Sequence, residues 1–237
     1  SMHTNHGFVE RVFDDISKPS EIHRSYNDRN LDFKQEEFTE TSNIKILIIG
    51  NSSARDIINV IRETYNMNKI DLIYRDDLDV CTTLNSKLGV RLFEKSNLVI
   101  YAGFDEILYK DRTFFIKNCI NSLVEKSNKI YNKLYFVGNK NFGNNLNWIV
   151  RIQKKKRSLL RNKLSKETLE TEELLKSMIP TNNYISILDI LIDENNSILI
   201  TDNQGRLISP DRDHLTRYGA IYVGENLSII PAKIINK

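Results

Sequence analysis

Three short apolar runs that each stop at a glycine constrain the fold of this chain most strongly. Ile44–Ile49 is followed by Gly50, and two later runs end at Gly103 and Gly138. A continuous apolar run bounded by a glycine is typical of a strand buried on both faces of a parallel sheet. Because parallel strands have their carboxyl ends at one edge, the three turns should meet there, where α/β sheets bind their ligands.

Segments with helical spacing separate these runs, so strands and helices alternate along the chain. We expect strands at Ile44–Ile49, Lys69–Tyr74, Leu98–Ala102, Leu134–Val137 and Tyr184–Leu188. We expect helices at Ala54–Tyr65, Thr113–Lys126, about Leu146–Lys176 and Tyr218–Leu227, with a short helical or irregular segment at Leu84–Glu94. Ser197–Thr201 and Arg206–Ser209 predict a hairpin. The alternation predicts an α/β fold with a mainly parallel sheet and helices on both faces.

Composition narrows the function classes. The 237 residues include 34 Lys and Arg against 31 Asp and Glu, a balance that argues against a nucleic-acid binder dominated by phosphate contacts. The basic run Lys154–Arg157 precedes several glutamates in Glu167–Glu173, so we interpret it as a solvated helix face. No apolar run approaches the roughly 18 residues of a membrane span, and no secretory signal pattern is present.

Ser52 lies between the first expected strand and the first expected helix. A helix start offers unpaired backbone N–H groups and a partial positive charge, both useful to a developing oxyanion. The alternative is that Asn51, Ser52 or Ser53 simply caps the helix, as these residue types often do. A phosphate-binding P-loop is excluded because the stretch lacks the Gly-Lys-Ser/Thr ending.

His214 is the only histidine outside the polar N-terminal stretch, which holds His3, His6 and His23. Imidazole titrates in the range that lets it accept a serine proton. Asp211, three residues earlier, can hydrogen-bond the far ring nitrogen and fix its tautomer, whereas the adjacent Asp213 is the weaker orienter. A surface turn is the alternative for this Asp-x-x-His unit.

Candidate oxyanion donors, metal ligands and the two cysteines can also be considered from the sequence. Candidate oxyanion donors are the Ser52 N–H, Gly103, the side chain or backbone near Asp105, and Asn141, although the glycines could equally serve as tight turns. No His/Cys/Asp/Glu cluster has metal-ligand spacing, so we expect neither a metal nor another cofactor. We expect Cys81 and Cys119 to be free core residues, with one disulfide as the alternative.

These residues resemble the SGNH (GDSL-type) hydrolase superfamily. Gly50-Asn51-Ser52 stands where that family has Gly-Asp-Ser, and Asp211–His214 matches its Asp-x-x-His block. Leu215–Ala220 looks like the continuation found in SGNH domains attached to bacterial acyltransferase-3 membrane proteins, which O-acetylate surface polysaccharides such as lipopolysaccharide O-antigen. His6–Arg11 is similar to a Gly-x-x-x-Arg element that follows the last membrane span of those proteins. The family's Gly-x-Asn-Asp block is replaced by Gly103-Phe-Asp105-Glu.

The resemblance implies a flavodoxin-like three-layer sandwich with a mainly parallel five-stranded sheet. It implies that residues 1–43 form a linker extension packed on an SGNH catalytic domain at residues 44–237. It also implies an O-acyltransferase, most simply an O-acetyltransferase, in which Ser52, His214 and Asp211 act on a glycan acceptor and an acyl donor. An acetylesterase with the same triad and a silent glycan-binding domain are the alternatives.

The same resemblance bears on partners and location. The opening Ser1-Met2 is typical of a cleaved tag, so the chain can be a piece of a longer protein that carries a membrane acyltransferase portion. In that case the domain would be a periplasmic or extracytoplasmic part of an inner-membrane protein. It would be cytoplasmic if the chain is complete.

Overall fold

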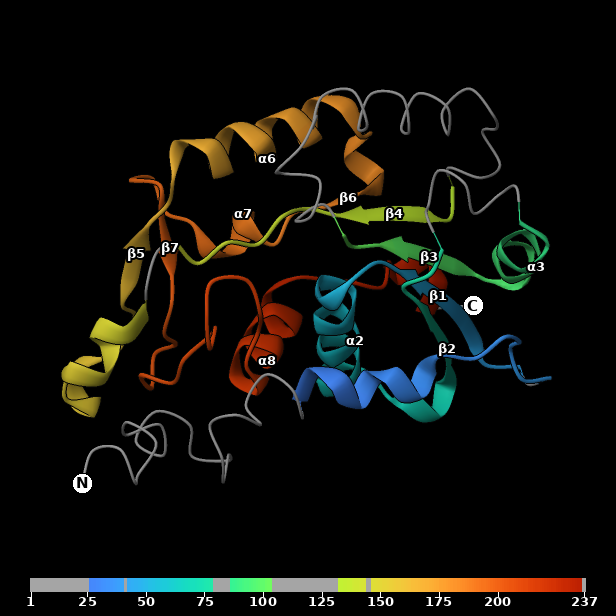
Figure 1. Ribbon diagram of the computed structural model, residues 1–237, viewed down its shortest axis with the longest axis horizontal. Coiled ribbons are helices and arrows are strands. Elements are labelled where there is room, and N and C mark those ends of the chain that lie inside the picture. Colours follow the sequence, from blue (N-terminus) through green and yellow to red (C-terminus); the bar gives the residue numbers. More distant parts are fainter. Residues whose placement is uncertain (1–25, 41, 79–85, 104–131, 144–145, 236–237) are drawn as a thin grey trace.

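The computed structural model describes residues 26–40, 42–78, 86–103, 132–143 and 146–235, arranged around a central sheet (Figure 1). Five parallel strands pair in the order β2-β1-β3-β4-β6. They are β1 (Ile44–Ile49), β2 (Ile70–Arg75), β3 (Leu98–Tyr101), β4 (Leu134–Val137) and β6 (Tyr184–Ile185). This order is that of flavodoxin-like sheets, so the α/β prediction is confirmed.

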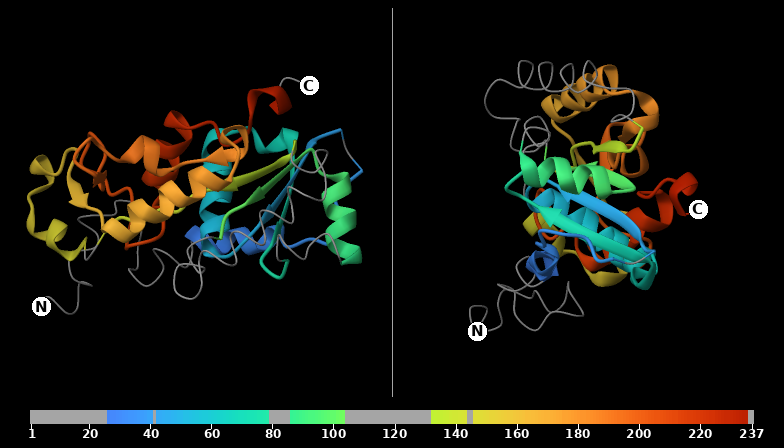
Figure 2. Two further views of the ribbon diagram at one scale, coloured as in Figure 1. Left: turned by 90° about the horizontal axis from the view of Figure 1, so that it is seen from above. Right: turned by 90° about the vertical axis from the view of Figure 1, so that its right-hand side faces the viewer.

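Helices cover both faces of the sheet, which gives three layers (Figure 2). On one face, Ile46 and Ile48 of β1 belong to a core cluster with α2 (Ser52–Thr64) and α8 (Arg217–Asn226). Leu47 and Ile49 point to the opposite face, in a cluster with α3 (Lys87–Lys95) and α6 (Lys166–Met178). β1 is therefore buried on both sides, as its continuous apolar run predicts.

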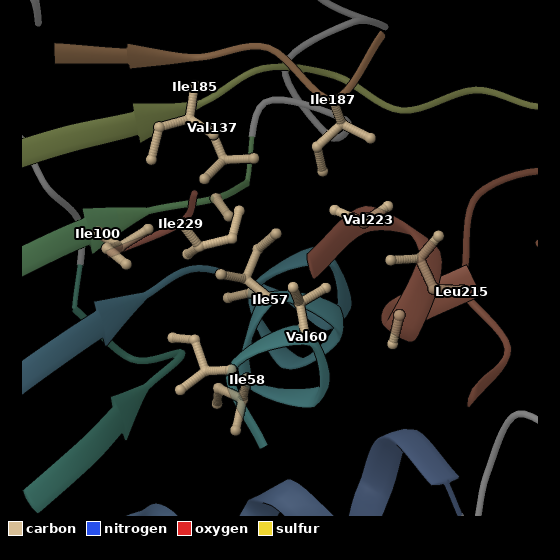
Figure 3. Packing of buried hydrophobic residues seen from close by; sticks show 14 of the residues in the cluster. Ile57, Ile58, Val60, Ile100, Val137, Ile185, Ile187, Leu215, Val223 and Ile229 are labelled. Atoms are coloured by element: carbon tan, nitrogen blue, oxygen red, sulfur yellow. The ribbon is translucent and has the colours of Figure 1, made fainter. Parts of the chain in front are cut away.

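The helix α2 is the main contact between the sheet and α8. Its side chains Ile57, Ile58 and Val60 are fully buried, and Figure 3 shows them between the strands and Val223 of α8. The helix predicted at Tyr218–Leu227 is confirmed as α8 with nearly the expected bounds, although the short helix α9 follows it. The predicted helix at 113–126 and both cysteines lie outside the described residues.

The long helix predicted at about 146–176 is wrong in its first half. Short 3-10 helices, η7 (Leu146–Arg151) and η8 (Lys154–Lys156), precede strand β5 (Arg161–Lys163). Leu159 has a φ of 53°, outside the helical region, and α6 starts only after Ser165, whose side chain accepts the Thr168 N–H. Propensity and charge pattern alone cannot reveal such a break.

The charged side chains of this stretch are solvent-exposed at Lys155, Lys156, Glu167, Glu170 and Glu173, as the solvated-face interpretation expects, but two others are buried. Arg157 is only 3% exposed, and its Nε donates to the Ile152 carbonyl at 2.7 Å. Glu172 on α6 is 1% exposed and accepts hydrogen bonds from the hydroxyls of Tyr184 and Ser186 at 2.8 and 2.5 Å. Both charged groups are therefore part of the packed structure.

The end of the sheet and the predicted hairpin also differ from expectation. β6 has two residues, because the chain turns into α7 (Leu188–Leu191) soon after it. β7 (Ser197–Leu199) pairs antiparallel with β5, while the second arm of the predicted hairpin contributes a single bridge between Thr201 and Leu207. The strand partner of β7 thus comes from earlier in the chain.

The 3-10 helix η3 (Arg29–Phe33) lies against α2 and β2, and Asn30 donates from its side chain to Asn59 at 2.9 Å. The remaining short helices are η4 (Met67–Lys69), η9 (Thr181–Asn183) and α9 (Ala232–Ile235). Among the residues that the structure describes, no helix is long and apolar enough to cross a membrane.

Candidate active site

Ser52 is the first residue of α2, just beyond the carboxyl end of β1. The Asn51 side chain caps the helix by accepting the Ser53 N–H at 2.9 Å. Of the three residues that could have capped this helix, Asn51 therefore does so, and the Ser52 hydroxyl has a different partner.

The partner of the Ser52 hydroxyl is the imidazole of His214. Nε2 of His214 lies 3.0 Å from Oγ of Ser52, although the two residues are 162 positions apart in the chain. The other ring nitrogen, Nδ1, lies 2.9 Å from Oδ2 of Asp211. The structure thus brings together the three residues singled out from the sequence.

The turn that carries His214 is held by its own side chains. Oδ1 of Asp211 accepts the backbone N–H groups of Asp213 and His214 at 2.8 and 2.9 Å. The Ser209 hydroxyl contacts the carbonyls of Asp211 and His214 at 2.7 and 2.5 Å. Asp211 therefore shapes the turn with one oxygen and contacts the ring with the other.

The electrostatics of the turn favour Asp211 over Asp213 as the orienting carboxylate. Burial by itself would raise the pKa of Asp211, but the hydrogen bond and charge of His214, with the backbone N–H groups, lower that pKa well below its usual range. Burial raises the pKa of Asp213, and the charges of Lys140 and Arg212 only partly oppose it. Asp211 is thus an ionised carboxylate that can accept a hydrogen bond from the Nδ1–H group of His214.

With its Nδ1 proton held in this way, the ring presents Nε2 as a base toward Ser52. The exposed fraction of the His214 side chain is 17% and that of Asp211 is 41%, so the site opens to solvent. An arrangement of hydroxyl, imidazole and carboxylate in this order can move a proton off the serine and form a covalent acyl intermediate.

The stretch Leu215–Ala220 after the histidine has a structural role. Thr216 caps α8 by accepting the Gly219 N–H at 3.0 Å. Gly219 packs against the Ile208 backbone so closely that a Cβ would lie 2.0 Å from the Ile208 carbonyl oxygen. Thr216 and Gly219 therefore fix the start of α8 close to the chain that leads into the His214 turn.

The candidate oxyanion donors lie in different surroundings in the structure. The Ser52 N–H belongs to the first turn of α2, and Gly103 is buried beside the Ser53 side chain in a small pocket that Gly138 and Lys140 also line. The Asn141 side-chain oxygen accepts the Gly143 N–H at 2.8 Å, a contact within its own loop. Asp105 lies outside the described residues.

Sequence reasoning missed a buried ion pair beside the serine. Nζ of Lys140 lies 2.9 Å from Oδ2 of Asp56, and their side chains are 2% and 0% exposed. The only signal was a carboxylate at position 56, directly before the apolar inner face of α2 at Ile57 and Ile58. No group of three or more His, Cys, Asp or Glu side chains in the described part of the chain could hold a metal ion.

Comparison with known proteins gives a distant likeness of fold. No protein family matches the sequence, and no curated protein matches it. A GDSL-like lipase from Bacteroides thetaiotaomicron is similar at a TM-score of 0.43 and 7% identity, over 86% of this chain and 95% of that one. A protein from Bacteroides fragilis described as an acylhydrolase is similar at 0.43 and 13% identity, over 89% and 96%. At these values the likeness concerns the fold alone and says nothing of the reaction of this chain.

Proposed function

We propose that this chain is a serine enzyme that transfers an acyl group, most simply acetyl, to a hydroxyl of a bacterial surface polysaccharide. The observation that supports acyl transfer is the continuous chain of contacts from Asp211 through His214 to Ser52. The choice of a glycan acceptor, and of a membrane acyltransferase portion as partner, depends on the motif resemblance around Asp211–Ala220 alone.

In the first half-reaction, Oγ of Ser52 attacks the acyl carbonyl carbon while its proton moves to Nε2 of His214. The ionised Asp211 stabilises the resulting imidazolium. The oxyanion develops next to the N-terminus of α2, where the Ser52 N–H can donate to it. As the intermediate collapses, the leaving group departs with the proton from His214 and the acyl group remains on Ser52.

In the second half-reaction, a sugar hydroxyl gives its proton to Nε2 of His214 and attacks the acyl carbon. The new ester forms on the sugar, and the proton returns to Oγ of Ser52 as the acyl–enzyme bond breaks. Water in place of the sugar would make the same machinery an acetylesterase. The solvent exposure of His214 and Asp211 favours keeping that second candidate.

A silent glycan-binding domain is the third candidate from the sequence. Such a domain would have no reason to keep a serine hydroxyl 3.0 Å from an imidazole that a carboxylate orients. That geometry counts against it, and labelling by a serine-directed fluorophosphonate separates it from both enzymes.

The test combines labelling with turnover. We expect the wild-type chain to be labelled at Ser52 and to release p-nitrophenol from its acetate. Ser52→Ala and His214→Ala should each lower kcat by roughly 10³-fold or more, because the members of a triad act as one unit. Ser53→Ala is the matched control and should still be labelled. Faster release with a glycan acceptor would favour the transferase, and normal turnover by Ser52→Ala would refute the assignment.

A further inference from the structure

We propose that Lys140 and Asp56 form a positioning pair that holds the Ser52 turn and the His214 turn at reacting distance. This inference rests on the proposed function and extends it to two residues that lie outside the triad. Both are charged, both are buried, and each contacts the chain on both sides of the site.

Lys140 joins three segments through its ammonium group. Nζ lies 2.9 Å from Oδ2 of Asp56, 3.0 Å from Oγ of Ser53 and 2.5 Å from the carbonyl oxygen of Asp213. An ammonium has three N–H donors, so three acceptors match its capacity. Ser53 follows Ser52 in the chain and Asp213 precedes His214, so a single side chain contacts a neighbour of each reacting residue.

Asp56 completes the connection from the α2 side. Its Oδ2 also accepts the backbone N–H of Leu215, the residue after His214, at 3.2 Å. Its Oδ1 accepts the side-chain amide of Asn27 at 2.8 Å, and that amide also contacts the carbonyl oxygen of Ser52 at 3.2 Å. The backbone on both sides of His214 is therefore tied to the first turns of α2.

A second contact supports the same connection. The loop after β4 that carries Lys140 also donates the Phe142 N–H to the Arg212 carbonyl at 2.8 Å. Two successive residues of the histidine turn, Arg212 and Asp213, are thus bonded to this loop. The loop, α2 and the turn come from three distant parts of the sequence, and Lys140 on the loop contacts both of the others.

The contacts exclude a different use of the same residues. Ser53 and Lys140 at 3.0 Å resemble a serine–lysine dyad, in which a neutral amine acts as the base. A buried carboxylate 2.9 Å from the amine stabilises its charged form, and all three N–H groups have acceptors. A charged ammonium has no lone pair to accept a proton, so Lys140 acts as a donor that fixes geometry.

Burying an ion pair is a poor way to gain stability, because removing two charges from water costs more than packing apolar groups of the same size. Directional hydrogen bonds specify position more narrowly than apolar contacts do. A displacement of about 1 Å between reacting groups can lower a rate by roughly 10²-fold. The pair therefore has its main effect on turnover and little effect on substrate binding.

The decisive variant is Asp56→Asn combined with Lys140→Met, which removes both charges together and so leaves no uncompensated charge in the buried site. We expect a folded protein whose kcat for p-nitrophenyl acetate falls about 10²-fold while KM changes less than about threefold. The rate of fluorophosphonate labelling at Ser52 should fall in parallel. Lys176→Met, which removes an ammonium 2.5 Å from Asp189, is the matched control and should leave both rates within about twofold.

Unchanged kcat and labelling rate in the folded double variant would overturn the positioning role. If the double variant does not fold, Asn27→Ala decides, because it removes the amide that contacts both Asp56 and Ser52. A fall of kcat by about threefold or more supports the proposal, and an unchanged kcat overturns it. Failure of the proposed function is distinguishable, because the wild-type protein would then be neither active nor labelled at Ser52.

Discussion

Replacement of Gly50 by alanine tests how the backbone delivers Ser52 to the site. Gly50 has a φ of +140°, a conformation that residues with a side chain rarely adopt. A Cβ at this position would lie 1.9 Å from the carbonyl oxygen of Ala102, the residue after β3. Because the obstacle is the backbone of a buried residue, the chain cannot relieve the contact by a side-chain rotation.

The expected cost has two parts. Holding alanine in a glycine conformation costs about 1–3 kcal/mol. Forcing an extra methyl group against packed backbone costs about 1–3 kcal/mol more. A value of about 4 kcal/mol lies in the middle of the summed range, and at about 2–4 °C per kcal/mol for a chain of this size the Tm should fall by about 8–16 °C.

The assay is thermal and urea unfolding followed by circular dichroism, with Gly103→Ala as the matched control. Gly103 follows the adjacent strand β3, but a Cβ there would meet the Tyr101 hydroxyl at 3.2 Å, and the end of a side chain can move. We expect Gly103→Ala to cost less than about 1.5 kcal/mol. If the two variants had free energies of unfolding within about 1 kcal/mol of each other, the reasoning about Gly50 would be wrong.

Two further predictions concern the cap and the histidine turn. Asn51→Ala should lower the free energy of unfolding by about 1 kcal/mol, because the Ser53 N–H loses its acceptor. Asn51→Asp should retain the cap and serves as the control. Equal stability of the wild type and both variants in urea would contradict this prediction. Asp213→Asn should keep most of the turnover. Since burial raises the pKa of Asp213, its ionised form destabilises the folded state, so the wild type should become less stable relative to the variant as pH rises through about 4. The check is the difference in urea midpoint between the wild type and Asp213→Asn, measured at pH 3 and at pH 7. If this difference were the same at both pH values, the expected pH dependence would be wrong.

The local pattern of apolar residues was sufficient to predict those strands that are buried on both faces. The run Ile44–Ile49 is one strand buried on both faces, and Leu134–Val137 is another with the predicted bounds. The pattern failed for Arg161–Lys163, a strand with no apolar residue, which exists because β7 offers it a pairing partner. Backbone pairing of this kind depends on a distant segment and leaves no periodicity in the sequence.

For the candidate site, too, some features could be predicted from the sequence and others depended on the tertiary structure. Residue chemistry alone singled out Ser52, Asp211 and His214, since few residue types can act as nucleophile, orienter and base, and their catalytic role stays a prediction. Only the tertiary structure decided that His214 lies 3.0 Å from Ser52 and that Lys140 is buried against Asp56. The physical reason is that side-chain type is a local property, whereas distance and burial depend on how the whole chain packs.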